Sequence, residues 1–153
     1  MRKAFYLLLM AVACRGGEAA PDDSAGGRLE VDGEPGGRMV DAAARGLACA
    51  RDTTVAIVGI GEEWAAAISM RTLLPSGGSE LRIRIAHDSI GGAMLALRAL
   101  GDTMFSITAD SGLLRLAEGD SLAGTFEAHA GRDSTLRRLS GRFAVPMPPD
   151  SCP

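Results

Sequence analysis

The chain has no asparagine or glutamine and only one lysine, Lys3, so arginine supplies nearly all of its positive charge. Together with abundant alanine and glycine, this composition is typical of a GC-rich genome and carries no functional message. The formal net charge of the 153 residues is −3, and no cluster of basic residues occurs. Nucleic-acid and polybasic membrane-surface binding both need such clusters, so we exclude these two classes of function.

Aromatic side chains are also scarce, at 4% of the chain. Beyond the first 13 residues only Trp64, Phe105, Phe126 and Phe143 remain. At least three of these four fall on the inward faces of predicted strands. No aromatic side chain is then left for an exposed stacking platform, which argues against a carbohydrate-binding module.

No long hydrophobic run is present at the N-terminus, where the apolar segment 4–13 is too short for the roughly 20 residues that a membrane-spanning helix needs. Arg2 and Lys3 precede this segment, and Ala11 and Ala13 end it. A positive start, a short apolar core and small residues before a cleavage point are typical of an export signal. We therefore expect residues 1–13 to be a signal peptide.

The segment 10–14, MAVAC, resembles the bacterial lipobox, in which a small residue precedes an obligatory cysteine that receives a diacylglycerol. It departs from the family at Ala11, where leucine is preferred. The resemblance implies cleavage before Cys14, lipidation of its sulfur and anchoring of the protein in a membrane of the cell envelope. Several acyl chains on one cysteine make such an anchor stable. Soluble secretion and an uncleaved anchor are the alternatives.

Residues 14–27 are predicted to be the lipidated cysteine and a flexible tether. The part that follows Cys14 consists of small and polar residues without a large apolar side chain, so it has little to bury. Its 13 residues span at most about 45 Å. We expect a single β-domain over residues 28–153.

Two cysteines remain once Cys14 is assigned to lipid. Cys49 and Cys152 are predicted to form a disulfide in an oxidising compartment, closing a loop of about 100 residues. Metal binding is the alternative for two isolated cysteines. It is disfavoured because the chain has no C-x-x-C motif and only two histidines, His87 and His129. We expect neither a metal nor another cofactor.

Alternating apolar and polar residues predict strands through the body of the chain. The clearest case is Leu81–Ile85, in which two arginines alternate with three aliphatic residues. Trp64–Arg71 alternates in the same way, although Glu62–Ala67 could instead begin a helical turn. Thr53–Val58 is β-branched and precedes two glycines, which also predicts a strand.

The C-terminal third predicts a three-strand meander. Gly112–Ala117 and Ser121–Ala130 flank a three-residue loop that pairs Leu116 with Leu122, and a third strand follows over residues 139–145. Residues 93–100 contain good helix formers. We favour a strand there, joined by a two-residue turn at Gly101-Asp102 to a strand at 103–108.

These strands predict an all-β fold, a small antiparallel sandwich or barrel of about seven to nine short strands. The repeated G-x-F at Gly124-Thr125-Phe126 and Gly141-Arg142-Phe143 resembles the meander that closes many secreted bacterial lipoproteins. That resemblance covers roughly the last 40 residues. It implies a β-sandwich-like domain and no particular activity.

Sequences that resemble catalytic motifs occur in unsuitable contexts. Gly119–Leu122 spells the GDSL of a hydrolase family, whose serine is the nucleophile, but no D-x-x-H follows and the context predicts a hairpin turn. Gly59-Ile60-Gly61 begins like a dinucleotide-binding loop but has Trp64 at the third glycine position. His87-Asp88 offers an imidazole beside a carboxylate without a nearby nucleophile, and His129 is predicted to be exposed. We therefore expect no enzyme.

Four arginines, Arg71, Arg82, Arg84 and Arg98, would form a basic strip if their strands are neighbours. Guanidinium groups suit carboxylate and phosphate recognition, so this strip predicts a face for an anion or an acidic partner. The ordinary alternative is a solvated sheet face. Our leading hypothesis is a membrane-tethered extracytoplasmic domain with a structural or partner-binding role. The alternative is a carrier of a small apolar ligand within a lipocalin-like barrel.

Overall fold

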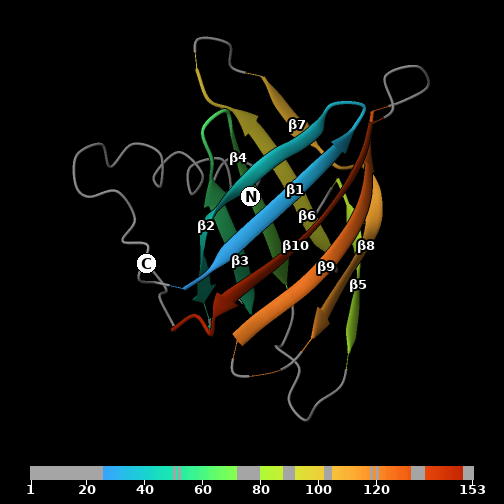
Figure 1. Cartoon of the computed structure of the whole chain (residues 1–153). Helices are drawn as coiled ribbons and strands as arrows, with labels where there is room; N and C mark the ends of the chain where they lie inside the picture. Colours follow the sequence, from blue (N-terminus) through green and yellow to red (C-terminus); the bar gives the residue numbers. More distant parts are fainter. Residues whose placement is uncertain are drawn as a thin grey trace.

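The chain folds into a closed β-barrel, as the computed structural model shows (Figure 1). The structure describes residues 26–49, 51, 53–71, 80–87, 92–101, 105–117, 119, 121–131 and 137–149. Its strands are β1 (Arg28–Glu34), β2 (Gly37–Cys49), β3 (Thr54–Ile60), β4 (Trp64–Arg71), β5 (Leu81–Ala86), β6 (Ala93–Ala99), β7 (Ser106–Thr108), β8 (Ser111–Ala117), β9 (Ser121–Ala130) and β10 (Arg137–Pro146). None of these described segments is helical.

Nine strands form the barrel and one lies outside it. The sheet order is β4-β3-β2-β1-β10-β9-β8-β5-β6-β7, and antiparallel pairing of β4 with β6 closes the barrel. The sheet is mixed because β5 and β6 meet in one parallel pair, Ile85 with Ala93. The all-β prediction and its barrel alternative are therefore confirmed, whereas the sandwich is wrong. The strand count of seven to nine was too low because β1 and β2 add to the expected set, whereas β7 lies within the strand predicted at 103–108.

The interior is lined by the apolar members of each alternating strand. In β1, for example, Leu29 and Val31 are fully buried, while Glu30 and Asp32, which alternate with them, lie on the outer wall. The same alternation operates in β5, where Ile83 and Ile85 are buried. The largest fully buried side chains come from strands all round the barrel: Leu29, Val31, Ile57, Ile68, Met70, Ile85, Leu95, Leu97, Leu114, Leu116, Leu122 and Leu139. These side chains form one continuous core.

The predicted C-terminal meander is confirmed as β8, β9 and β10. Its first register differs from the prediction, since Leu116 pairs with Gly124 and not with Leu122. Ala117 pairs with Ala123, so the connection from β8 to β9 is longer than the predicted three residues. A shift of two residues leaves every side chain on its predicted face, because the side-chain period of a strand is two.

Residues 93–100 form a strand and not a helix, and the Trp64 segment likewise begins a strand. The predicted two-residue turn after β6 is wrong, because Leu97 pairs with Ile107 and the Ala99 amide donates to the Phe105 carbonyl. With this longer connection both Leu97 and Ile107 are buried in the hydrophobic core. A two-residue turn would have paired Leu97 with a serine and turned Ile107 outward.

The repeated G-x-F sequences form a reciprocal pair of contacts between β9 and β10. Gly124 pairs with Phe143, and Phe126 pairs with Gly141, so each ring lies over the glycine of the neighbouring strand. Both rings are buried at 3% exposure. Each glycine therefore provides the space that the opposite ring occupies, which explains the spacing of the motif.

Candidate functional site

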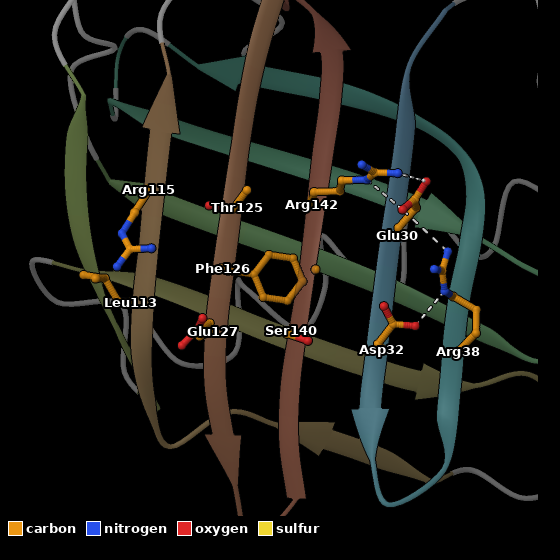
Figure 2. Close-up of a pocket in the computed structure, with 11 residues that line it drawn as sticks. Glu30, Asp32, Arg38, Leu113, Arg115, Thr125, Phe126, Glu127, Ser140 and Arg142 are labelled. Atoms are coloured by element: carbon orange, nitrogen blue, oxygen red, sulfur yellow. Dashed lines mark hydrogen bonds and ion pairs between the residues drawn. The ribbon is translucent and has the colours of Figure 1, made fainter.

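Side chains that are mostly polar line the outer wall of β8, β9, β10, β1 and β2 in two rows, and Figure 2 shows most of them. The strand registers align the first row as Arg115, Thr125, Arg142, Glu30 and Asp41. The second row lies next to the first along the strands, on the same face. It contains Leu113, Glu127, Ser140, Asp32 and Arg38. Side chains far apart in the sequence thus lie side by side on one face.

Glu30 is the centre of an ion-pair network in these rows. Arg142 binds it with two nitrogens, Nε at 2.8 Å and Nη2 at 3.2 Å from the two carboxylate oxygens. Arg28 and Arg38 approach the same carboxylate at 3.3 and 3.6 Å. The Glu30 side chain is 14% exposed and that of Arg142 is 72% exposed, so the carboxylate lies beneath its cations.

Two further carboxylates complete this network. Arg38 Nε donates to Asp32 Oδ1 at 2.6 Å, and Arg28 Nη2 lies 2.6 Å from Asp41 Oδ1. Three arginines therefore face three acids, and their charges balance. A balanced network of partly covered ion pairs fixes the wall of the barrel without leaving a net charge to attract a ligand.

The network also shifts the acid–base behaviour of its members. The pKa of Glu30 is lowered from 4.5, chiefly by the hydrogen bond from Arg142 and further by the positive charges around it, against the opposing effect of desolvation. The hydrogen bond to Asp32 raises the pKa of Arg38, and the hydrogen bond to Glu30 raises that of Arg142. Glu30 is consequently ionised at neutral pH and unsuited to act as a general acid or base.

A groove of about 440 Å³ runs over these two rows. Its floor includes the pairing of Phe126 with Gly141, and the remaining lining residues are Glu30, Asp32, Arg38, Leu113, Arg115, Thr125, Glu127, Ser140 and Arg142. Figure 2 shows Arg115 at the far side of the groove from the Glu30 network. Among the described residues Arg115 makes no ion pair, unlike Arg38 and Arg142.

The predicted basic strip is only partly assembled. Arg82 lies directly opposite Arg115 across β5 and β8, and Arg84 lies opposite Leu113. Arg82 contacts Glu80 at 2.8 Å, whereas Arg84 has no ion-pair partner within the described part of the chain. Arg98 is level with Ala65 of β4, and Arg71 is at the other end of that strand, about 20 Å away.

The arginine that joins Arg82 and Arg84 on this face is therefore Arg115, which the sequence analysis missed. It also missed Glu30, Asp32 and Arg38. A usable signal existed, because residues 28–32 alternate charged and apolar side chains in the same way as residues 81–85. Pro35-Gly36 then marks the turn to β2.

Other sequence candidates occupy less suitable positions. His87 Nδ1 lies 3.7 Å from Asp110 Oδ1, beyond hydrogen-bonding distance, and its side chain is 74% exposed. Asp110 also accepts a hydrogen bond from the Gly131 amide at 2.8 Å. Asp88 lies outside the described residues. His129 is exposed on the outer face of β9, as predicted.

The GDSL sequence and the Gly59-Ile60-Gly61 sequence both lie among antiparallel strands. Gly119 lies in the connection from β8 to β9, and Ser121 is the first residue of β9, paired with Pro146. Gly59 is inside β3, where an added Cβ would lie 3.0 Å from the Leu29 side chain. An antiparallel strand, and not a helix, follows Gly61. Within the described ranges, no three side chains of the metal-binding types form a group that could hold an ion.

Several predictions concern residues outside the described part of the chain. The signal peptide, Cys14 and most of the tether are among them. Cys49 is the last residue of β2, but Cys152 is not described, so the pairing of these two cysteines stays a prediction. Over the ranges that are described, no helix is long and apolar enough to cross a membrane.

Comparison of the chain with protein-family models, with curated proteins and with solved structures found no match. The chemistry of the outer wall and the sequence of the N-terminus are therefore the basis for a functional proposal.

Proposed function

We propose that this protein is an extracytoplasmic lipoprotein, tethered through Cys14, whose barrel binds a partner that carries negatively charged groups. The signal-like N-terminus, the MAVAC segment and the tether composition support the envelope location. The barrel serves as a rigid, non-catalytic scaffold that holds the binding face away from the lipid.

The observation that carries the binding role is the unequal charge balance across the groove. On one side, the acids Glu30 and Asp32 neutralise the arginines beside them. On the other side, Arg115 and Arg84 lack ion-pair partners among the described residues, and Arg82, which is paired with Glu80, stands directly opposite Arg115. Like charges placed opposite each other on neighbouring strands destabilise a sheet. A bound carboxylate or phosphate group would relieve this repulsion.

The second candidate, a carrier of a small apolar ligand, is favoured by the closed barrel itself. We place it second because large side chains such as Leu95, Leu114 and Phe126 occupy the interior. A carrier would have to move these side chains before a ligand could enter. A fluorescent fatty-acid probe that enters the barrel, and that a filling substitution at Ala128 displaces, would reverse this order.

The tether is tested by mass spectrometry of the mature protein. We expect the N-terminal residue to be Cys14 with a mass that includes diacylglycerol. An N-terminus that begins at another residue, or an unmodified cysteine, would contradict the lipoprotein proposal.

The binding face is tested by titrating the protein with an oligoglutamate peptide and, separately, with inorganic phosphate. We expect binding that weakens as salt is raised and that Arg115→Ala abolishes. Arg45→Ala is the matched control, because Arg45 is an exposed arginine on the part of β2 that pairs with β3. Equal binding by the two variants, or no binding of either anion, would refute the proposal.

A further inference from the structure

Exposed apolar side chains gather at one end of the barrel. Ile60 and Phe105 are each 54% exposed and Leu100 is 39% exposed, and these are three of the four large exposed hydrophobic residues in the described ranges. Together with Trp64, which is half-buried and packs against the core, they make up a cluster that we call the apolar end. The exposure of Phe105 corrects the expectation that no aromatic side chain would be left at the surface.

Hydrogen bonds between strand ends bring these four residues together. Trp64 pairs with Ala99 at the start of β4, and the Leu100 amide donates to the Glu63 carbonyl at 2.7 Å. The Trp64 and Phe105 rings meet edge to face, with centroids 6.2 Å apart. In Figure 1 the β3–β4 turn lies at the same end of the barrel as the end of β6 and the start of β7. Because Ile60 pairs with Ala65, next to Trp64, backbone pairing places all four residues at adjoining strand ends.

We propose that the apolar end inserts into the surface of the lipid bilayer to which the protein is tethered. This inference rests on the proposed tether, whose 13 residues keep the barrel within about 45 Å of the lipid. Tryptophan and phenylalanine suit the boundary between water and hydrocarbon. A weak second contact adds substantially to attachment when a first anchor already holds the protein nearby.

The charges around the apolar end indicate which lipids it contacts. Glu62 and Glu63, both exposed in the β3–β4 turn, lie beside Ile60 and Trp64. Carboxylates repel an anionic lipid surface. The apolar end therefore prefers zwitterionic headgroups, in contrast to the arginine face of β5 and β8.

Trp64 provides a direct measurement, because it is the only tryptophan in the chain. The mature protein is mixed with phosphatidylcholine vesicles whose acyl chains are brominated, and Trp64 emission is recorded. We expect a blue shift and quenching of that emission, both reduced when phosphatidylglycerol replaces half of the lipid. Unquenched emission from vesicle-attached protein would overturn the inference.

Two substitutions separate insertion from simple proximity. Ile60→Ser removes an exposed side chain from the apolar end without altering the ring that contacts Trp64, and it should abolish quenching. Met147→Ser is the control, because Met147 is 44% exposed but follows β10 and is not part of the cluster. Quenching that survives Ile60→Ser would overturn the inference.

Dimerisation of the protein and the state of its N-terminus are measured separately, because each would contradict a different part of the proposal. If the apolar end instead joins two copies of the chain, sedimentation without vesicles will show a dimer that Ile60→Ser dissociates, which would refute membrane insertion. The mass of the N-terminus is measured on the same sample. An acylated protein with unquenched Trp64 would defeat this inference alone, whereas an unmodified N-terminus would defeat the proposed tether.

Discussion

Replacing Gly141 with alanine tests the reciprocal packing of β9 and β10. An added Cβ would lie 2.5 Å from Cζ and 2.9 Å from Cε1 of the Phe126 ring, and it would also strike the backbone carbonyl of Glu30. The ring is 3% exposed and the carbonyl belongs to β1, so neither can move freely. Overpacking of a core costs about 1–3 kcal/mol. With a backbone clash added, we expect Gly141→Ala to reach the upper end of that range.

The free energy of unfolding is measured by denaturant titration, with Trp64 emission as the signal. A loss of about 3 kcal/mol corresponds to a fall of about 10 °C in Tm for a domain of this size. Gly119→Ala is the matched control, since an added Cβ there meets only the Ser121 carbonyl oxygen, 4.0 Å away. We expect the control to change stability by less than about 0.5 kcal/mol.

A second substitution identifies the source of the strain. In a Phe126→Leu background, the smaller side chain gives space to the new Cβ, so Gly141→Ala should cost less than in the natural chain. The clash with the Glu30 carbonyl remains, so part of the cost persists. If Gly141→Ala destabilises no more than Gly119→Ala, the ring does not occupy the space over the glycine and the packing argument is wrong.

Three further predictions concern single groups. Because the pKa of Glu30 lies below 4.5 in the fold, its contribution to stability is present above pH 4.5 and is lost as pH falls through the lowered value. The free energies of unfolding of the natural chain and of Glu30→Gln should therefore converge at acid pH, and a difference that stays constant with pH would contradict this. The buried Ser69 hydroxyl has no hydrogen-bond partner in the described structure, so Ser69→Ala should leave Tm unchanged or raise it, and a clear fall would reveal a missed partner. Non-reducing peptide mapping should recover Cys49 linked to Cys152, and reduction should cost roughly 4 kcal/mol of unfolding free energy, whereas a free Cys152 would exclude the pair.

Local patterns determined much of the fold in advance. The alternation at Leu81–Ile85 and in the last three strands placed the correct side chains inside the barrel. Even the error of two residues at Leu116 preserved its face. These features depend on neighbours in the sequence, where the strand period of two acts directly.

Barrel closure and the arrangement of the outer wall were less accessible from the sequence. The pairing of Trp64 with Ala99 joins strands that are not consecutive, and no single segment specifies it. The groove likewise depends on four registers at once, and Arg115 and Glu30 share a row only after three of them align β8, β9, β10 and β1.

The seam between β1 and β10 has a consequence for when the molecule folds. Arg28 pairs with Ala144, so the first strand finds its second neighbour only after almost the whole chain exists. Until β10 pairs with it, β1 has one unpaired edge, and the barrel cannot close around its hydrophobic core. Long-range pairing of this kind slows folding. A nascent polypeptide therefore cannot close the barrel before β10 has been synthesised, and this delay is compatible with the proposed export of a chain that has not yet folded.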